Sequence, residues 1–592
     1  MRFRSRQAAA GRVFAVSGVN TVSFGVIASE QTKEGLLGFA VERIDRPSGA
    51  ARFMPGFKVF ASVIPAPAEG LQVSTFDHPV QSFVWDDFTA RPKCEYVYRF
   101  HPIKGRSGSL DRRSRPLSIT VRTEPLFTDG THDVFFNRGV ASSQAYSRRF
   151  GSDPIDELQP DRRAAALTWL SRDLDDAIVR FIESCQPGDR LLGCFYEFRY
   201  APIADKLKAA VTRGVDVALI VDAKVNEYTD KDGVFHESFP RTKNLELIAE
   251  SGLGDQVTHR EARPSTIAHN KFMVRIAGGR PAEVWTGSTN LSLGGIHGQT
   301  NVGHWVRDPS TAEQFARYWQ LLADDPGGLA ADTAREKIRK NRTFKDAVHE
   351  LSPVPADLTQ VPAGVTAVFS PQPDDAALNA YAQLLDAARN QACITLAFGI
   401  NPAFKELLKN NTPQSQLVFM LLEKKDLPRR GSATPFVRIN AANNTYKAWG
   451  SFLDNPVYQW VRETNALQLR LNQHVAYVHS KFMLIDPLGS DPIVVTGSAN
   501  FSADSAKEND ENMLLIRGAP RVADIYYTEF NRLFNHYYFR SVVEQLGRNR
   551  PLPSQPSVFL DETPGWQTKY TPGAFRAKRL QLYTTMSGAR TL

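Results

Sequence analysis

The sequence predicts an α/β protein built from two similar lobes that follow an all-β N-terminal domain. Two copies of one motif, His-X-Lys followed by Gly-Ser-X-Asn, begin at His269 and His479, and in each copy the Asn lies 21 residues after the His. Around each copy, buried-type strands alternate with amphipathic helices, which is typical of α/β folds. The first 125 residues instead carry short strand-like runs separated by turns. Such a repeat predicts two αβα lobes related by pseudo-two-fold symmetry.

The composition fits an ordinary soluble protein and favours an anionic partner. The chain has 592 residues, of which 42% are hydrophobic and 23% charged, with a net charge of +8. Phosphate, nucleic acid and a membrane surface all suit that charge. The chain contains no apolar run of about 18 residues, so we expect no transmembrane segment. Its four cysteines show no metal-type spacing and are too few for a disulfide scaffold, which predicts a cytoplasmic protein.

Residues 1–125 are predicted to form a β-sandwich. Strand-like runs occur on both sides of Gly18 and again at residues 36–43, 82–85, 96–100 and 117–121. The segment 92–98, Pro-Lys-Cys-Glu-Tyr-Val-Tyr, resembles the tyrosine-corner strand of fibronectin type III domains. No catalytic constellation is visible in this domain. We therefore expect it to bind a protein or to dock against the catalytic lobes.

The two predicted lobes occupy residues 126–350 and 351–545. In the first, one long helix through residues 167–185 precedes a β-α-β alternation, which predicts a largely parallel sheet, and a polar insertion follows at 226–233. The second lobe repeats this order after a connector, residues 325–362, that contains a charged helix. The segment 546–592 is rich in Pro and basic residues, and we expect an extended, partly ordered tail.

The motif places its polar side chains on one face of a predicted strand. Side chains two apart on a strand share a face, so His269 and Lys271 point the same way, as do His479 and Lys481. A later strand in each lobe ends in Gly-Ser-X-Asn, where glycine lets the backbone approach closely. The polar side chains delivered there are Ser288, Asn290, Ser498 and Asn500.

A His, a Lys and an Asn from each lobe suit a tetrahedral phosphate. Two ammonium groups and two amides would meet its non-bridging oxygens, with one imidazole on each side of the phosphorus. The serines at positions 288 and 498 either support the turn or contact the phosphate, and the sequence does not distinguish these roles.

These residues resemble the phospholipase D superfamily, whose signature is His-X-Lys, then an Asp after four further residues, then Gly-Ser-X-Asn. The resemblance covers both lobes, residues 128–545. It implies a two-step phosphodiester transfer that needs no metal and no cofactor. One His attacks phosphorus and becomes a phosphohistidine, while the other protonates the leaving oxygen and then activates water or an alcohol.

The two copies differ at the position that supports the His. Eleven residues after the motif Asn stands Glu511 in the second copy and Asn301 in the first. In the family an acidic residue near this point is expected to support the His of its own lobe. A carboxylate favours a protonated imidazole, whereas an amide does not. We therefore expect His479, backed by Glu511, to be the general acid, and His269, oriented by Asn301, to be the nucleophile.

The signature Asp also differs between the copies, with Asp486 in the second and Ile276 in the first. If this acid is required, the first lobe is decayed and the protein only binds its ligand. We expect instead that the Asp supports structure more than chemistry, since the other motif residues of the first lobe are present.

Two further groups of polar residues carry weaker expectations. Tyr196 and Glu197 end a predicted parallel strand, where ligands often bind, but core packing or a surface salt bridge is the expected role. The basic residues after the corresponding strand of the second lobe are expected to form a solvated loop and not a phosphate track. These are Lys424, Lys425, Arg429 and Arg430.

Three functions of different classes remain open from the sequence. The first is a phospholipase D-type enzyme that hydrolyses or exchanges a lipid headgroup (transphosphatidylation), favoured because both motifs lie in one chain. The second is a metal-independent endonuclease, favoured by the mild basicity. The third is a non-catalytic binding protein. The sequence offers no amphipathic anchor, so any membrane contact is expected to be peripheral, and no aromatic-basic ladder for single strands.

Overall fold

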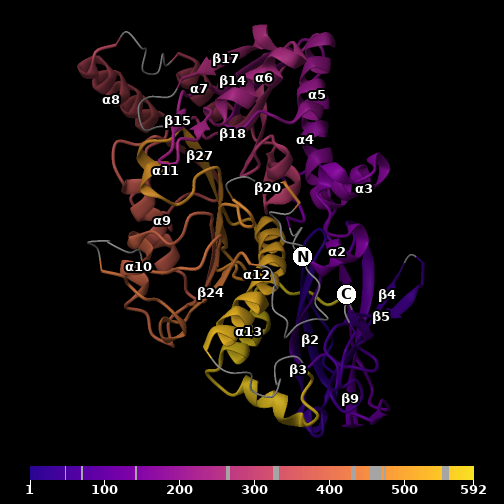
Figure 1. Cartoon of the computed structure of the whole chain (residues 1–592). Helices are drawn as coiled ribbons and strands as arrows, with labels where there is room; N and C mark the ends of the chain where they lie inside the picture. Colours follow the sequence, from indigo (N-terminus) through magenta and orange to yellow (C-terminus); the bar gives the residue numbers. More distant parts are fainter. Residues whose placement is uncertain are drawn as a thin grey trace.

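The structure, a computed structural model, describes residues 1–46, 48–68, 71–139, 143–261, 267–324, 332–428, 435–451, 469–471, 475–549 and 559–592. Figure 1 shows the whole chain, with the two lobes beside and above the N-terminal strands. Arg429 and Arg430, two of the four basic residues in the predicted loop, lie outside the described residues.

The N-terminal region forms two sheets that share a hydrophobic core. The first has the order β1-β2-β3-β8, and in the second β9 pairs with β4, β10 and β11 while β5 pairs with β4. Their strands are β1 Arg2–Arg4, β2 Gly11–Ser17, β3 Val22–Ala28, β8 Val84–Asp87, β4 Gly38–Asp45, β5 Ala51–Phe53, β9 Glu95–Arg106, β10 Ser109–Asp111 and β11 Leu117–Arg122. Aromatic side chains from both sheets meet, and Phe24 contacts Tyr98 with ring centroids 4.6 Å apart. The Tyr96 hydroxyl accepts a hydrogen bond from the Arg91 N–H at 2.9 Å; a relation to fibronectin type III domains stays a prediction.

Each lobe contains a seven-stranded sheet, and the two sheets have the same strand order. The first is β12-β20-β19-β18-β13-β14-β17 and the second β21-β27-β26-β25-β22-β23-β24. The strands of the first are β12 His132–Phe136, β13 Arg190–Phe195, β14 Asp216–Asp222, β17 Val257–Arg260, β18 Lys271–Ala277, β19 Arg280–Gly287 and β20 Val302–Val306. Those of the second are β21 Gly364–Ser370, β22 Gln391–Leu396, β23 Leu417–Leu422, β24 Thr445–Trp449, β25 Phe482–Ile485, β26 Ile493–Gly497 and β27 Glu511–Arg517.

The expectation of largely parallel sheets was wrong. In the first sheet β13 pairs parallel with β14, and β14 with β17, whereas the other four pairings are antiparallel. The second sheet repeats this pattern. The β-α-β alternation precedes the motif in each lobe, but the motif itself opens a meander of three antiparallel strands. Gly278-Gly279 alone connects β18 to β19, and a two-residue connection permits only antiparallel pairing of consecutive strands.

Helices cover the sheets and also lie between them. They are α2 Gln144–Phe150, α3 Pro160–Ser171, α4 Leu174–Glu183, α5 Ala201–Thr212, α6 Arg241–Ser251, α7 Pro309–Asp324, α8 Ala334–Leu351, α9 Ala376–Asp386, α10 Pro402–Leu408, α11 Ala503–Lys507, α12 Pro520–Asn549 and α13 Phe575–Thr584. The single helix expected through residues 167–185 is two helices, because Arg172 adopts a φ of 55° and its guanidinium donates to the carbonyl of Phe136.

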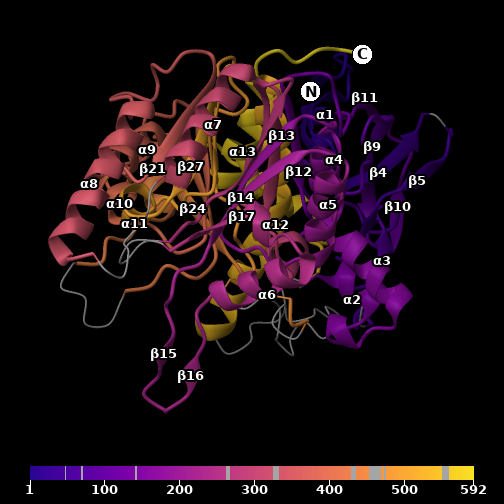
Figure 2. The ribbon, with the colours of Figure 1, turned by 90° about the horizontal axis from the view of Figure 1, so that it is seen from above.

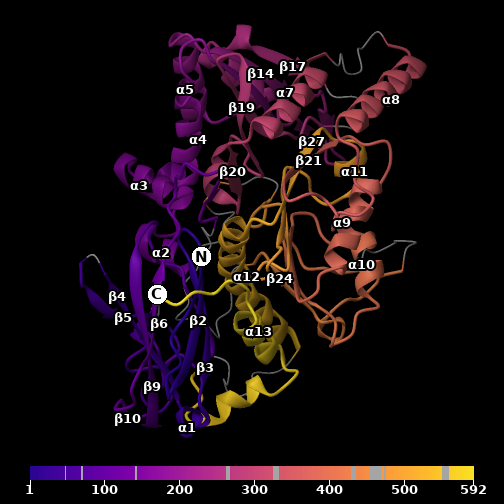
Figure 3. The same cartoon turned by 180° about the vertical axis from the view of Figure 1, so that it is seen from behind.

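One hydrophobic core joins the two lobes. It includes the inner faces of both sheets together with α7 and α12. The motif phenylalanines belong to it: Phe272 contacts Phe315 of α7, and Phe482 contacts Phe530 of α12. Figures 1 and 3 show α12 running between β24 and the N-terminal strands. The lobes are therefore packed as one body and not as two separately folded halves.

The described part of the C-terminal segment contains helices, unlike the extended tail expected from its sequence. The helix α12 continues to Asn549, and residues 559–592 form a 3₁₀ helix, Pro564–Tyr570, and α13. Trp566 is buried in the core of the N-terminal sheets and Tyr583 against α12. These apolar side chains fix the segment to the body of the protein. The Pro-rich residues 551–558 lie outside the described residues.

None of the helices in the described ranges has the length and apolar character needed to cross a membrane. The cysteines at positions 94, 185, 194 and 393 are free thiols.

Candidate active site

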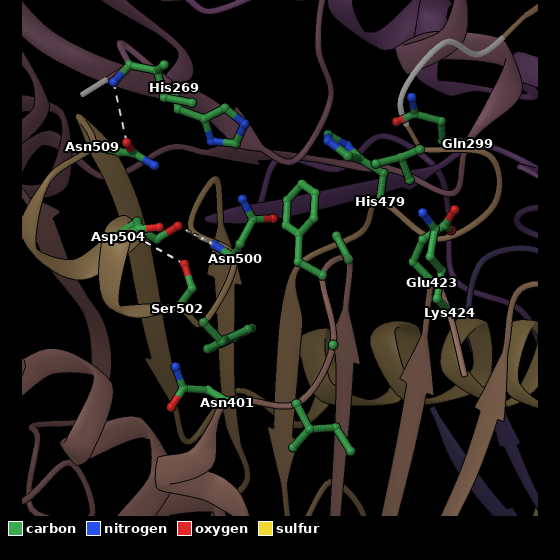
Figure 4. Close-up of a pocket in the computed structure, with 18 of the residues that line it drawn as sticks. His269, Gln299, Asn401, Glu423, Lys424, His479, Asn500, Ser502, Asp504 and Asn509 are labelled. Carbon is green, nitrogen blue, oxygen red and sulfur yellow. Dashed lines mark hydrogen bonds between the residues drawn. The ribbon is translucent and has the colours of Figure 1, made fainter. Parts of the chain in front are cut away.

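Both copies of the motif contribute to one cavity between the lobes, with a volume of about 1530 Å³. His269 and Asn290 line it from the first lobe, and His479 and Asn500 from the second. Figure 4 shows the imidazoles of His269 and His479 pointing toward one another across the cavity. The four side chains that the sequence predicted to converge on a ligand are thus brought together.

The motif histidines stand just before their strands, not on them as expected. The strand β18 begins at Lys271 and β25 at Phe482. Each motif lysine is buried, and its ammonium group donates to the carbonyl of the preceding motif His. The Lys271 Nζ lies 2.5 Å from the oxygen of His269, and the Lys481 Nζ lies 2.6 Å from that of His479. The lysine therefore fixes the backbone that carries the imidazole.

The groups that support the two histidines come from the opposite lobe, so the expected pairing was wrong. Both carboxylate oxygens of Glu511 lie 2.9 Å from Nδ1 of His269. The Asn301 Oδ1 lies 2.9 Å from Nδ1 of His479. Glu511 opens β27 and Asn301 precedes β20, and both strand starts lie at the interface between the lobes. The nearest imidazole there belongs to the other lobe.

Neighbouring contacts between the lobes stabilise this arrangement, in which Glu511 of the second lobe supports His269 of the first. The Asn512 side chain donates to Asn270 Oδ1 at 2.8 Å, and the Asp510 N–H donates to the carbonyl of Ile267 at 3.1 Å. The buried carboxylate of Asp510 also accepts from the Arg260 guanidinium at 2.5 Å. The start of β27 is thereby fixed against the loop that carries His269.

The hydrogen bonds determine which ring nitrogen carries the proton in each neutral imidazole. The Asn301 amide donates through Nδ2 to the carbonyl of Gly295 at 2.7 Å, so its Oδ1 must face His479. An amide oxygen only accepts, and Nδ1 of His479 therefore carries a proton. The ionised carboxylate of Glu511 requires the same of His269. In both rings Nε2 is left with the free lone pair.

Burial shifts the pKa of each of these groups toward the neutral form. It raises the pKa of Glu511 to about 7, although Lys271 opposes the shift. Burial, together with Lys271 and Lys481, lowers the pKa of His269 well below its usual value, and the pKa of His479 is lowered in the same way. Glu511 and His269 therefore share one titrating proton, and Nε2 of His269 is free only after that proton has left.

The two motif lysines lie in a buried environment that favours the binding of an anion. Burial lowers the pKa of Lys271 to about 8. Burial and the charge of Lys271 lower the pKa of Lys481 well below its usual value. Two lysines placed together in a buried site lose part of their positive charge, and a bound anion stabilises their charged forms. A phosphodiester is such an anion.

Two further acids, which the sequence analysis missed, hold the segments that carry the histidines. Asp222, at the end of β14, accepts from the Ala268 N–H at 2.9 Å. Glu423, directly after β23, accepts from three consecutive N–H groups, the last being that of Val478 at 2.7 Å. Ala268 and Val478 each directly precede a motif His. We call Asp222 and Glu423 the clasp acids. Their matching positions at the ends of equivalent strands are the sequence signal that could have identified them.

Tyr196 and Glu197 line the cavity, and the salt bridge expected at this position is also present, between Glu197 and Arg199. Glu197 accepts from Asn290 Nδ2 at 2.8 Å and also pairs with Arg199. The Tyr196 ring lies 4.9 Å from the imidazole of His269 and 5.3 Å from the Lys271 ammonium. Their position at the end of a parallel strand was the correct signal. Lys424 and Lys425 also line the cavity.

The motif amides and hydroxyls divide into two roles. The side-chain oxygens of Asn290 and Asn500 are buried without a hydrogen-bond partner among the described residues, so a bound ligand or water can satisfy them. The hydroxyl of Ser288 donates to Asn301 at 2.8 Å, and that of Ser498 accepts from the Asn512 N–H at 3.0 Å. These contacts favour the supporting role for both serines.

The signature Asp lies away from the cavity. Asp486 accepts from the N–H groups of Arg389, Asn390 and Gln391 at 2.8, 2.7 and 3.0 Å, which joins β25 to the start of β22. In the first lobe Ile276 is part of β18 and pairs with Arg190. Neither residue contacts the histidines. Across the described ranges, no group of three His, Cys, Asp or Glu side chains is arranged to hold a metal ion.

The fold and the paired motif place the chain in the phospholipase D superfamily. The chain matches the family model described as "Cardiolipin synthase, PLD-like domain" over residues 178–322 and 382–534, half of its length, and it belongs to that family. A search of the curated proteins found no match.

Solved structures with low sequence identity also match the chain. Phosphatidylserine synthase from Haemophilus influenzae is 12% identical, with a TM-score of 0.41, over 64% of this chain and 91% of that one. Polyphosphate kinase from Porphyromonas gingivalis is 11% identical, with a TM-score of 0.35, over 69% of this chain and 53% of that one, so the match spans about half of the kinase. Nuc from Salmonella typhimurium, a phospholipase D family member, is 17% identical, with a TM-score of 0.20, over 29% of this chain and 93% of that one.

Proposed function

We propose that the protein is a phospholipase D-type phosphodiesterase that forms a covalent phosphohistidine on His269 and uses His479 as the general acid. The observation that carries this proposal is the exchange of supporting groups between the lobes. It gives one cavity two imidazoles with the same tautomer and different partners, a carboxylate for His269 and an amide for His479.

The partners suit the two roles for a reason that differs from the one expected. When Nε2 of His269 attacks phosphorus, the imidazole keeps its Nδ1 proton and gains positive charge, which the Glu511 carboxylate stabilises. The Asn301 amide gives no such stabilisation, so a protonated His479 releases its proton readily. His269 therefore stays the proposed nucleophile, now because Glu511 faces it.

The reaction divides into two displacements at phosphorus. In the first, a bond forms between Nε2 of His269 and phosphorus, the bond to the leaving oxygen breaks, and His479 gives that oxygen its proton. In the second, His479 takes a proton from water or an alcohol, whose oxygen attacks phosphorus and displaces His269. Water gives hydrolysis and an alcohol gives transfer. Lys271 and Lys481 stabilise the charge on the non-bridging oxygens.

The proposed substrate is a phospholipid, and the N-terminal sheets are proposed to be a fibronectin type III-like sandwich docked on the lobes. Docking is supported by the buried ion pair between Arg2 and Asp524 and by the pair between Glu124 and Arg521. The common strand order of the two lobe sheets supports a pseudo-two-fold axis between them. A cytoplasmic location stays a prediction that the four free thiols support.

A substrate that needs no general acid tests the assignment of roles. Bis(4-nitrophenyl) phosphate releases nitrophenolate without a proton, so the first displacement can proceed without His479. The His479→Ala variant should release a rapid burst of one nitrophenolate per active site and then stall, with a 4-nitrophenyl phosphoryl group bound to His269. The His269→Ala variant should give no burst. Stopped-flow absorbance and peptide mass spectrometry measure both.

Phosphate found on His479 would reverse the proposed roles, and cellular function retained in both alanine variants would favour a non-catalytic binding protein. Assays of wild-type protein on phospholipid vesicles and on DNA, both in EDTA, then separate the lipid substrate from the nuclease alternative. His479→Ala protein serves as the control in each assay.

A further inference from the structure

Exposed apolar side chains gather at the mouth of the cavity. The strands β15 (Tyr228–Thr229) and β16 (Phe235–His236) form a hairpin that projects from the first lobe, as Figure 2 shows. Large apolar side chains of this arm and of the facing wall of the second lobe are more than half exposed. They are Val225, Tyr228, Val234 and Phe235 on the arm and Phe398 and Leu427 on the wall. We call these six side chains the rim.

The rim belongs to the active-site cavity and not to the surface at large. Tyr228, Phe398 and Leu427 line the cavity, so the arm and the wall stand on either side of its opening. The other exposed large apolar side chains of the described surface are scattered over the N-terminal sheets, α8 and the C-terminal end. They are Ile27, Phe57, Val63, Ile338 and Leu592. A gathering of exposed apolar groups marks an interaction site, whereas scattered ones need no explanation.

The arm holds its shape through its own contacts. The rings of Tyr228 and His236 stack with centroids 4.6 Å apart. Asp230 accepts from the Val234 N–H at 2.9 Å, and its other oxygen lies 2.9 Å from Nε2 of His236. The arm therefore presents its apolar side chains without support from the hydrophobic core.

The charges of the arm distinguish between two possible substrates. Residues 224–237 carry four carboxylates, at Glu227, Asp230, Asp232 and Glu237, against two lysines, at Lys224 and Lys231. A nucleic acid binds through cations that neutralise its phosphates, and an acidic arm repels it.

A phospholipid surface with zwitterionic headgroups matches the same features. Its cationic amines complement the carboxylates of the arm, and its interfacial layer accepts the apolar side chains. On the facing wall Lys424 and Lys425 stand beside the cavity, where they suit lipid phosphates.

We propose that the rim docks the enzyme on a zwitterionic phospholipid surface and so delivers a lipid phosphate to the cavity. The proposal rests on the proposed phosphodiesterase function and names the physical form of its substrate. Docking through a short arm and a loop requires no amphipathic helix.

Vesicle binding by full-length protein tests the proposal. The double substitution Val234→Ser with Phe235→Ser changes two rim residues that do not line the cavity. It should weaken binding to phosphatidylcholine vesicles by about tenfold or more, because neither side chain then buries apolar surface in the interfacial layer. Hydrolysis of bis(4-nitrophenyl) phosphate should be unchanged. Ile338→Ser, an exposed apolar residue of α8 remote from the rim, is the matched control and should bind as wild type does.

Each outcome bears on one proposal at a time. Equal vesicle binding by wild-type and double-variant protein overturns the docking proposal, as does wild-type protein that binds DNA but not vesicles. The His269→Ala variant should still bind vesicles. If wild-type protein binds vesicles through the rim yet cleaves neither lipid nor the soluble diester, the phosphodiesterase proposal fails and the docking surface stands.

Discussion

The two lobes repeat one sheet order and one motif, yet they surround their histidines with different chemistry. His269 faces the carboxylate of Glu511, and His479 faces the amide of Asn301. Because each supporting group comes from the other lobe, a change in one lobe alters the imidazole of its partner. The comparison teaches that the lobes are unequal through their interface and not through their folds.

The signature acid gives a second comparison. In the second lobe Asp486 follows β25 and accepts from N–H groups at the start of β22. In the first lobe Asp189, which precedes β13, accepts from the Gly278 N–H and the Arg275 guanidinium at the end of β18. Equivalent strands are thus joined by a carboxylate in both lobes, but from opposite sides. The first lobe has no Asp at position 276, and Asp189 makes the equivalent connection between the strands instead.

Removal of the carboxylate that distinguishes the lobes should have the largest effect. Glu511→Gln should slow formation of the phosphoenzyme by about 100- to 1000-fold, because the charge developing on His269 loses its counter-charge. Asn301→Asp makes the lobes more alike and should shift the pH–rate profile of the same step to higher pH, because a carboxylate raises the pKa of His479. Rapid-quench measurements with a lipid substrate give both rates. A Glu511→Gln variant as fast as wild type would contradict the assigned partners.

Substitution of the clasp acids should have the next largest effect on kcat, and the effect should be similar in the two lobes. Asp222→Ala and Glu423→Ala free the backbone before His269 and His479, and each should lower kcat by about 10- to 100-fold through misplacement of the imidazole. Asp222→Asn and Glu423→Gln keep an acceptor oxygen and should restore most of the rate with KM unchanged. Steady-state kinetics on the soluble diester test this. If the conservative variants are as slow as the alanine variants, the acids do not act by positioning.

The lysine pair predicts how anion binding changes with pH. Lys271 is charged below its pKa of about 8 and neutral above it. Affinity for a phosphate analogue such as tungstate, which keeps its charge over this pH range, should therefore fall as the pH rises through 8, by up to about tenfold for each pH unit. Calorimetry between pH 6 and 9 measures the slope. Lys271→Met should bind more weakly and lose that pH dependence, and a variant that keeps it would assign the titration to another group.

Loss of the Asp486 carboxylate, which connects β25 to β22, should lower stability and leave catalysis unchanged. Asp486→Ala removes the acceptor of three backbone N–H groups and should lower the free energy of unfolding by about 1–3 kcal/mol. Asp189→Ala is the matched change in the first lobe. Urea unfolding should show a lower free energy of unfolding, whereas kcat on the soluble diester should stay unchanged. A large fall in kcat at unchanged stability would place Asp486 in the chemistry after all.

The sequence was sufficient for features that depend on local pattern. Motif spacing predicted that His269, Asn290, His479 and Asn500 would share one cavity, because equivalent positions in a repeat occupy equivalent places. The strands and most helices followed their apolar periodicity. The break at Arg172 did not, because apolar spacing continues on both sides of it.

Features that depend on the lobe interface could not be read from the sequence. The distance along the chain from Asn500 to Glu511 suggested support within one lobe, whereas the imidazole that Glu511 meets is 242 residues away. The parallel-sheet expectation failed because a β-α-β pattern does not reveal the meander that follows it. The burial of Tyr583 and Trp566 depends on surfaces that other parts of the chain create.

The exchange of supporting groups has a consequence for how such a site can arise. A pair of identical chains related by a two-fold axis must give both histidines the same partner. A carboxylate on one side and an amide on the other require two halves of different sequence, which the two lobes of this single polypeptide supply. Glu511 and Asn301 are therefore positions at which the two lobes are not interchangeable, although the order of their strands is the same.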